Sequence, residues 1–329
     1  MYNAKITATA YHVPEKVVTN QDLEKILDTS DEWIRTRTGI RERRFAARGE
    51  TTSDLAAAAS QKLLEQRGIA ARDVDCIVVA TITPDMFFPS TACLVQEKIG
   101  AKRAWGFDLS GACSGFLYAL ATASQFVHSG AYRKVLVIGA DLMTSILNPK
   151  DRNTYVLFGD AAGAILLEPT RRGEQGIIDF ILRCDGSGGR FLCMPGGGSL
   201  HPASHETVRK NMHFVHQDGR AVFKYAVQGM AEVTTDILKR NHIRASDLAL
   251  FVPHQANIRI IDAVAERLGL HPSKVVRNIE DFANTTAATL PIGIAESHER
   301  RRLHKGDLVL LATFGAGFTS GSLLFRWTL

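Results

Sequence analysis

Three polar residues of this chain have the type and the setting of catalytic groups, and Cys113 is the first. It follows the strand-like run AWGFDL and precedes a helix-like run of small and apolar residues that starts at Gly115. The sulfur is therefore expected at a helix N-terminus, where unpaired N–H groups and the helix dipole favour a thiolate. The small neighbours Gly111 and Ala112 leave room for a substrate. Cys113 is thus a candidate nucleophile, although many cysteines in apolar surroundings are inert core residues.

The other two candidates are His254 and Asn284. His254, Gln255 and Asn257 belong to the segment PHQAN, which directly follows an apolar strand-like run. This places them at the carboxyl end of a strand, where ligand sites of α/β sheets gather. Asn284 opens a helix-like run in ANTTAA, a position in which asparagine is also a good N-cap. A neutral histidine and an asparagine facing a thiol would be a pair of hydrogen-bond donors, which suits the stabilisation of an enolate or oxyanion.

An internal echo gives a reason for these residues to meet. Three pairs of segments resemble each other at a separation of about 170 residues: 71–80 with 245–254, 107–123 with 280–296, and 133–141 with 306–314. Cys113 and Asn284 occupy corresponding helix starts in the second pair. A duplicated α/β unit is indicated, in which equivalent helix starts approach one another near the pseudo-symmetry axis.

The echo predicts two halves, residues 1–170 with the cysteine and residues 171–329 with the histidine and asparagine. Within each half, continuous apolar runs alternate with amphipathic runs such as 51–68, which favours buried, mostly parallel or mixed sheets covered by helices. Two such halves would bury a shared helical layer between two sheets. Gly and Pro clusters at 186–202 predict a long loop excursion.

The composition is that of a soluble globular protein, with 45% apolar and 22% charged residues among 329. No apolar run is long enough to span a bilayer, and the N-terminus lacks a secretory signal pattern, so a cytoplasmic location is expected. The net charge of +5 is too mild to indicate nucleic-acid binding, and it suits anionic small molecules or an acidic protein partner. The five cysteines show no disulfide or zinc spacing.

Two glycine-rich segments, FGDAAGA at 158–164 and FGAGFTSG at 314–321, match neither a dinucleotide-binding nor a P-loop pattern. They are expected to form tight turns, or to direct backbone N–H groups at an oxyanion. No nucleotide cofactor and no metal is expected.

Several motifs in order along the whole chain resemble the ketoacyl-acyl-carrier-protein synthase III family. They are SDEWIRTRTGIRERR (30–44), GACSGF (111–116), FGDAAGA, VPHQAN (252–257), FANTTAA (282–288) and FGAGFTSG. The resemblance implies the thiolase fold, five layers in the order α-β-α-β-α, and a homodimer. It also implies a decarboxylative Claisen condensation of a short acyl-CoA, most simply acetyl-CoA, with malonyl-acyl carrier protein.

The resemblance also implies a role for each matching residue. Cys113, His254 and Asn284 would be the catalytic set, with the backbone N–H groups of Cys113 and Ala316 as the oxyanion hole. The remaining positions divide by ligand: Trp33, Arg37, Arg152 and Asn257 for coenzyme A, Phe88 for the acyl pocket of the partner subunit, and Gln255, Lys224, Arg259 and Arg267 for the acidic carrier protein.

Two departures from the family pattern concern these roles. Ala316 stands where a glycine is usual, and its backbone N–H is kept if the backbone angles permit. Glu266 stands beside Arg267 where a second basic residue is common, which is expected to weaken carrier-protein binding.

Other functions are also compatible with these residues. A thiolase-fold condensing enzyme or acyltransferase of a polyketide, quinolone or long-chain head-to-head pathway would carry similar motifs. A cysteine hydrolase would use His254 as a general base on Cys113, oriented by Asn284. A non-catalytic coenzyme A-binding protein is the simplest alternative.

Overall fold

The computed structural model describes residues 3–171 and 173–329, and its first half is built on a five-stranded sheet. In spatial order the strands are β1 (Ala4–His12), β7 (Ala161–Pro169), β6 (Val135–Asp141), β4 (Cys76–Ala80) and β5 (Trp105–Leu109). β4 runs parallel to both β5 and β6, while β7 runs antiparallel to β1 and β6. Every residue of β4 and β6 is buried, which explains their continuous apolar sequences.

The second half is built on a four-stranded sheet. Its strands lie in the order β11 (Leu250–Pro253), β12 (Leu308–Gly315), β13 (Thr319–Arg326) and β8 (Ile177–Cys184). β11 and β12 are parallel, and the other two pairings are antiparallel.

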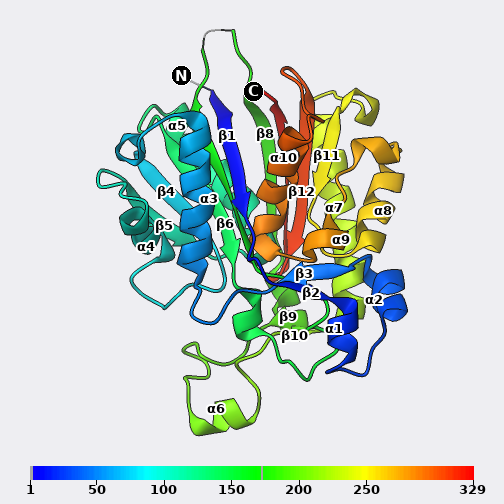
Figure 1. Cartoon of the computed structure of the whole chain (residues 1–329). Coiled ribbons are helices and arrows are strands. Elements are labelled where there is room, and N and C mark those ends of the chain that lie inside the picture. Colours follow the sequence, from blue (N-terminus) through cyan, green and yellow to red (C-terminus); the bar gives the residue numbers. More distant parts are fainter. Residues whose placement is uncertain (1–2, 172) are drawn as a thin grey trace.

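Helices separate and cover the two sheets, giving five layers (Figure 1). α5 (Gly115–His128) and α10 (Thr289–Glu299) lie between the sheets and share one apolar core with both. α3 (Thr52–Arg67) and α4 (Thr91–Lys98) cover the outer face of the first sheet. α7 (Gly219–Arg240) and α8 (Ile258–Arg267) cover the outer face of the second. This confirms the fold class expected from the sequence.

The internal echo corresponds to equivalent elements. The 3₁₀ turns η1 (Ala71–Asp73) and η5 (Ala245–Asp247) precede β4 and β11, and the turns η2 (Ala112–Ser114) and η7 (Thr286–Ala288) precede α5 and α10. β6 and β12 are the parallel neighbours of β4 and β11. The turns η2 and η7 contact each other, which brings the starts of α5 and α10 together.

Close backbone approach makes this meeting possible. A side chain at Gly139 of β6 would collide with the carbonyl group of Ala287 in η7, so glycine is required there.

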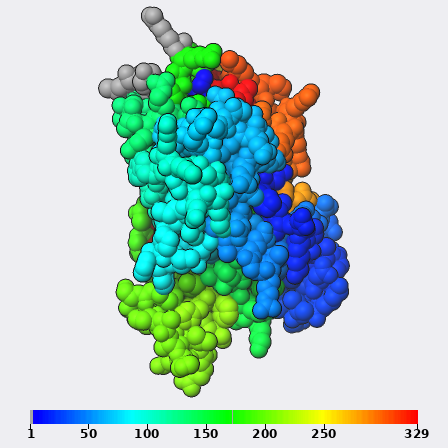
Figure 2. Space-filling view, turned by 60° about the vertical axis from the view of Figure 1, so that its left-hand side comes forward, coloured from blue at the N-terminus to red at the C-terminus, as the bar shows by residue number. Residues whose placement is uncertain are grey.

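Two smaller regions extend from the layers. Near the chain start, β2 (Val17–Thr19) pairs with β3 (Glu42–Arg44), joined through α1 (Asn20–Glu24) and α2 (Asp31–Thr38), and α9 (Ile279–Phe282) packs against β3. The predicted excursion carries the turn η4 (Gly186–Phe191), β9 (Leu192–Cys193), α6 (His205–Arg209) and β10 (His216–Gln217). The α6 segment projects from the lower end of the molecule (Figure 2).

The remaining 3₁₀ turns are η3 (Met143–Ile146) after β6 and η6 (Pro272–Lys274) after α8. None of the helices in the described parts of the chain is long and apolar enough to cross a lipid bilayer.

Candidate active site

Cys113 lies in the turn η2 between β5 and α5, as the sequence predicts. The preceding residue, Ala112, has a φ of 46°, in the left-handed region that residues with a Cβ seldom adopt. The Thr313 hydroxyl of β12 donates a hydrogen bond of 2.9 Å to the Cys113 carbonyl oxygen. A Cβ on Gly315 would stand 3.1 Å from the Cys113 nitrogen, so glycine lets the end of β12 approach the nucleophile turn.

The Cys113 thiol is only 6% exposed, and this burial decides its charge. Burial, followed by the negative charge of Asp141, raises the pKa of the Cys113 thiol to about 12. The helix start was expected to favour the thiolate, but loss of solvation outweighs that effect. Cys113 therefore rests as a neutral thiol and must lose its proton when it attacks.

His254 directly follows β11, and its backbone N–H donates to the Ala312 carbonyl of β12 at 2.8 Å. The ring is buried, and burial lowers the pKa of His254 to about 3. Its Nδ1 lies 2.7 Å from the hydroxyl of Thr289 at the start of α10. His254 is therefore a neutral imidazole at physiological pH.

Asn284 lies between α9 and η7 and is buried. Its backbone N–H donates to the Leu157 carbonyl at 3.0 Å, and its side-chain oxygen accepts the Thr286 N–H at 2.9 Å. The local bond to Thr286 resembles the capping role that asparagine often has. This bond uses the oxygen Oδ1, which is the hydrogen-bond acceptor of the Asn284 amide. The side-chain NH₂ group is its hydrogen-bond donor.

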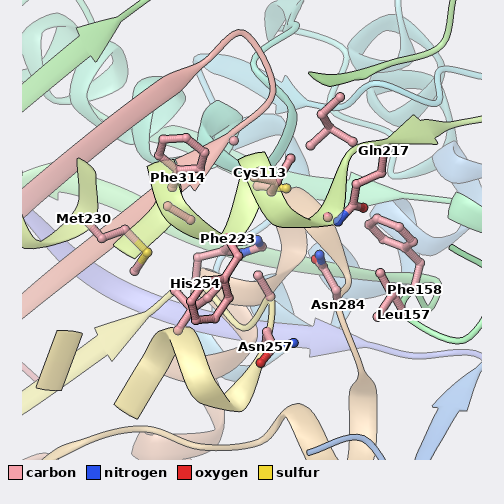
Figure 3. Close-up of a pocket in the computed structure, with 17 residues that line it drawn as sticks. Cys113, Leu157, Phe158, Gln217, Phe223, Met230, His254, Asn257, Asn284 and Phe314 are labelled. Atoms are coloured by element: carbon pink, nitrogen blue, oxygen red, sulfur yellow. The ribbon is translucent and has the colours of Figure 1, made fainter. Parts of the chain in front are cut away.

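Two cavities meet at Cys113. The first is a narrow space of about 90 Å³ bordered by Cys113, His254 and Asn284 (Figure 3). Its walls also include α7, α8 and the end of β12, through Gly219, Val222, Phe223, Asn257, Ile260 and Phe314. The second, of about 550 Å³, also borders Cys113 and is mostly apolar, with Ile82, Met143, Ile146, Leu192, Met194 and Val215 in its wall. Cys113 therefore borders two cavities. We call the narrow cavity the passage and the larger one the chamber.

Three of the four residues expected to bind coenzyme A lie together at α2, around the Trp33 ring. The guanidinium carbons of Arg37 and Arg152 lie 5.1 Å and 5.0 Å from the centre of the Trp33 ring. Arg152 also donates to the Asp28 carbonyl oxygen at 2.6 Å. Arg152 therefore lies directly against the Trp33 ring.

The PHQAN loop requires one correction. Gln255, expected to contact a carrier protein, is only 1% exposed. Its amide donates to the carbonyls of Pro253 and Val276 at 2.8 Å and 3.1 Å, and accepts the Asn278 N–H at 3.1 Å. Gln255 thus holds the loop together from inside, where a docking protein does not reach.

Asn257 has a different place. It caps α8 by accepting the Arg259 N–H at 2.9 Å, donates to the Arg37 carbonyl at 2.9 Å and borders the narrow cavity. It therefore links the Trp33 region to the passage that leads to Cys113.

The three basic residues expected at a carrier protein are all exposed on the neighbouring helices α7 and α8. Lys224 follows Phe223, which borders the narrow cavity, and the Arg259 guanidinium lies 5.2 Å from the Phe223 ring centre. Arg267 ends α8 beside the exposed Glu266. Positive charge from Arg259 therefore lies against Phe223, which borders the narrow cavity.

Two further predicted residues lie in turns. Phe88 is 84% exposed, in the segment between β4 and α4, and borders neither of the two cavities in its own chain. Ala316 follows β12 and borders the larger cavity together with Cys113. Its carbonyl accepts the Thr319 hydroxyl at 3.0 Å.

Sequence reasoning missed two groups of residues at this site. One is Asp141 with Thr286 and Thr289, which lie behind Asn284 and His254. The sequence holds a signal for Asp141, because this aspartate ends an otherwise apolar strand. The other group is the chamber wall supplied by the excursion, including Leu192, Met194 and Val215, for which the glycine-rich sequence offers no register.

In residues 3–171 and 173–329, no group of three or more His, Cys, Asp and Glu side chains could hold a metal ion. All five cysteines are free thiols.

Comparison with known proteins shows the family of the chain. The family model described as 3-oxoacyl-[acyl-carrier-protein] synthase III matches residues 107–186, and the model for its C-terminal part matches residues 238–327. The beta-ketoacyl-[acyl-carrier-protein] synthase III of Koribacter versatilis is 55% identical over 325 residues, which are 98% of each chain.

Solved structures extend the agreement to the fold. The crystal structure of the synthase III from Thermus thermophilus superposes with a TM-score of 0.91 at 44% identity, covering 98% of this chain and 99% of the other. A priming beta-ketosynthase of the R1128 polyketide pathway superposes with a TM-score of 0.92 at 33% identity, covering 99% and 97%. The chain therefore belongs to the 3-oxoacyl-[acyl-carrier-protein] synthase III family and is an acyltransferase of the condensing type that starts fatty acid synthesis.

Proposed function

We propose that this enzyme transfers the acetyl group of acetyl-CoA to Cys113 and condenses it with malonyl-acyl carrier protein to give a 3-oxoacyl-carrier protein. The observation that carries the proposal is the place of Cys113. Cys113 borders both the narrow passage, which His254 and Asn284 also border, and the mostly apolar chamber. A pantetheine arm would reach the thiol through the passage, and the chamber would receive the acyl chain.

In the first half-reaction the sulfur of Cys113 attacks the thioester carbonyl of acetyl-CoA. The thiol proton leaves the sulfur, and coenzyme A departs as the thiol after taking up a proton. The tetrahedral oxyanion would be held by the backbone N–H groups of Cys113 and Ala316. This role is supported by the place of Cys113 and Ala316, which border the same larger cavity.

In the second half-reaction malonyl-carrier protein presents its thioester in the same passage. Its carboxylate leaves as carbon dioxide, and the two electrons of the broken C–C bond form an enolate. His254 and Asn284 would donate hydrogen bonds to the enolate oxygen. The enolate carbon then attacks the Cys113 thioester, and the sulfur leaves and regains its proton.

Loss of carbon dioxide drives the condensation, so the proposed reaction requires neither a redox cofactor nor a metal. His254 fits a donor role better than a basic one, since burial keeps its pKa near 3. The same fact disfavours a cysteine hydrolase, in which His254 would have to be a general base.

The substrates would be bound at two surfaces. The nucleotide of coenzyme A would lie between Trp33 and Arg152, with Arg37 near its phosphates. The acidic carrier protein would dock on Lys224, Arg259 and Arg267 at the mouth of the passage.

We also propose a homodimer formed through β5, in an enzyme that works in the cytoplasm. β5 has β4 as its one neighbour in the described sheet, so its other edge is open. Trp105 is 42% exposed and packs with Phe107, Phe126 and Tyr132 beside this edge. Pairing of two β5 strands would cover the edge, and Phe88 could then reach the chamber of the partner subunit.

Light scattering tests the dimer. We expect twice the chain mass for the wild-type protein and the chain mass for Trp105→Asp. A wild-type monomer at micromolar concentration would contradict the proposal.

The starter acyl group is tested separately, because the chain is also 33% identical to the R1128 priming ketosynthase. Competition between acyl-CoA substrates of increasing length and branching measures the choice of starter. Preference for acetyl-CoA supports the proposal, and preference for a longer or branched starter would contradict it.

Product formation tests the reaction itself. Wild-type enzyme with acetyl-CoA and malonyl-carrier protein should give a 3-oxoacyl-carrier protein, whereas His254→Ala should be acetylated but should not decarboxylate the malonyl group. Hydrolysis of acetyl-CoA without condensation would support the hydrolase instead.

A further inference from the structure

A buried carboxylate contacts the turn that follows Asn284, and the reaction proposed above gives it no role. Asp141 is the last residue of β6 and is 0% exposed. One carboxylate oxygen accepts the Thr286 hydroxyl and, at 3.1 Å, the Ala287 N–H, both in the turn η7. The other oxygen accepts three donors from the loop after β4 at 2.8 to 3.1 Å, namely the hydroxyls of Thr81 and Thr83 and the N–H of Ile82. Asp141 thus joins a loop of the first half to a turn of the second.

The partners of Asp141 fit an ionised carboxylate. The Thr81 and Thr83 hydroxyl oxygens accept backbone N–H groups, from Thr83 at 3.0 Å and from Leu142 at 2.8 Å, which leaves their hydrogens for Asp141. Burial raises the pKa of Asp141, and the hydrogen bonds act in the opposite direction. Because all five partners are donors, a carboxyl proton would be a sixth hydrogen among them. The surroundings therefore favour the charged form.

Thr286 is held in a conformation that a β-branched residue seldom adopts. Its φ is 49°, in the left-handed region, and such a conformation persists only where the surrounding structure holds it. Asp141 supplies that hold, through the Thr286 hydroxyl and the N–H of the next residue. In this conformation the Thr286 N–H donates to Oδ1 of Asn284 at 2.9 Å. The orientation of the Asn284 amide therefore depends on the contact between Thr286 and Asp141.

The turn η7 resembles the nucleophile turn η2 in its first residue. Ala112 begins η2 with a φ of 46°, and Thr286 begins η7 with a φ of 49°. The next N–H group belongs to Cys113 in η2 and to Ala287 in η7. In η7 this N–H donates to the Asp141 carboxylate, whereas in η2 the proposed function assigns it to the substrate oxyanion. The turn η7 is therefore an anion-binding turn whose anion belongs to the protein itself.

We propose that Asp141 is a positioning residue for the enolate step, because its carboxylate holds η7 in the conformation in which the Thr286 N–H fixes the amide of Asn284. This inference rests on the proposed function, in which the NH₂ group of Asn284 donates to the enolate oxygen. Acetylation of Cys113 does not involve Asn284 in that reaction. Asp141 should therefore matter for decarboxylation and not for acetylation.

Asp141→Asn tests this role with a side chain of the same shape. Its NH₂ group replaces one acceptor oxygen and faces donors, so η7 or the loop after β4 has to shift. Release of labelled carbon dioxide from malonyl-carrier protein should slow about 10- to 100-fold, because small displacements of reacting groups are costly. Acetylation of Cys113 should not fall, since the negative charge of Asp141 is one of the causes, after burial, that raise the pKa of the thiol. Decarboxylation at the wild-type rate, or equal losses in both half-reactions, would overturn the proposal.

Asp75→Asn is the matched control. The Asp75 carboxylate accepts the N–H groups of Arg133 and Lys134, both at 2.8 Å. It precedes β4 (Cys76–Ala80), at the opposite end of that strand from the loop that Asp141 contacts. This variant should decarboxylate at close to the wild-type rate, and a loss equal to that of Asp141→Asn would count against a specific role.

A double-mutant cycle shows whether Asp141 acts through Asn284. The Asn284→Ala protein has no amide to orient. Adding Asp141→Asn to it should therefore slow decarboxylation by less than about threefold, although the same change is costly in wild-type enzyme. Two losses that multiply in full would show that Asp141 acts independently of Asn284, and the proposal would be wrong.

Thr286→Val and Thr286→Ser decide the question if Asp141→Asn does not fold. Valine keeps the branched shape and loses the hydrogen bond to Asp141, whereas serine keeps a hydroxyl. Thr286→Val should decarboxylate about tenfold more slowly, and Thr286→Ser should lie closer to wild type. Equal rates in the two variants would remove the contact with Asp141 from the account.

A crystal structure of Asp141→Asn, or of Thr286→Val in its place, gives a readout that does not depend on activity. We expect η7 to shift and the Asn284 amide to turn away from its wild-type orientation. An Asn284 amide in the wild-type position would overturn the proposal. If wild-type enzyme fails to condense the two substrates, the proposed function fails, and the orientation of Asn284 in the variant still decides whether Asp141 positions it.

Discussion

The hydroxyl of Thr313 donates a 2.9 Å hydrogen bond to the carbonyl oxygen of Cys113, and this bond ties the second sheet to the nucleophile turn of the first. Both residues are buried. The position of the nucleophile therefore depends on the packing of the two halves and not on its own turn alone.

Thr313→Val should misplace Cys113 without changing its chemistry. We expect acetylation to slow about tenfold, because small displacements of reacting groups are costly. The free energy of unfolding should fall by about 1–3 kcal/mol, since the buried carbonyl loses a partner. Single-turnover acetylation and urea unfolding measure the two effects. Thr313→Ser, which keeps the hydroxyl, is the control, and equal behaviour of both variants would argue against this role.

The reactivity of Cys113 should depend steeply on pH. Since burial raises its pKa to about 12, the thiolate fraction should grow about tenfold per pH unit between about pH 7 and pH 9. Iodoacetamide alkylation of the free enzyme, followed peptide by peptide with mass spectrometry, measures this. The exposed Cys93 and Cys184 serve as internal references. A rate that levels off below about pH 8 would show a thiolate stabilised at rest.

Trp33→Ala should separate the two substrates. Acetyl-CoA carries a nucleotide and the carrier protein does not, so only the KM for acetyl-CoA should rise, by about tenfold for a lost stacking and cation–π partner. Trp33→Phe keeps an aromatic ring and should lie close to wild type. A parallel rise in the KM for malonyl-carrier protein would mean that Trp33 supports the fold instead.

Reversing charge at Lys224 and Arg267 should affect only the second substrate. The double variant Lys224→Glu, Arg267→Glu should raise the KM for malonyl-carrier protein about tenfold at low salt, with a smaller effect at high salt. Acetylation by acetyl-CoA should not change. Lys305→Glu is the matched control, because Lys305 is exposed just before β12, at the opposite end of that strand from Cys113. An equal effect of the control would remove the case for a docking surface.

Much of the site could be predicted because its residues lie at element ends with clear local signals. Cys113 and His254 follow apolar strands, and the echo placed Asn284 opposite Cys113. Each of these positions is defined by its neighbours along the chain, and the hydrophobic pattern of the sequence shows those neighbours.

What could not be predicted depends on packing between distant segments. The buried place of Gln255 and the neutral Cys113 thiol follow from burial that no local pattern encodes. Asp141 and Thr286 meet across 145 positions of sequence, and their bond exists only when the two halves are assembled. The chamber wall formed by Leu192, Met194 and Val215 likewise exists only when distant segments pack together.

The central claim is that Cys113 carries the acyl group. Enzyme incubated with acetyl-CoA alone, digested and examined by mass spectrometry, should show one added acetyl group on the Cys113 peptide, removed by malonyl-carrier protein as the 3-oxoacyl product appears. Cys113→Ser should show no acetyl thioester and no product. An unmodified Cys113 peptide in active wild-type enzyme, or full activity in Cys113→Ser, would contradict the mechanism.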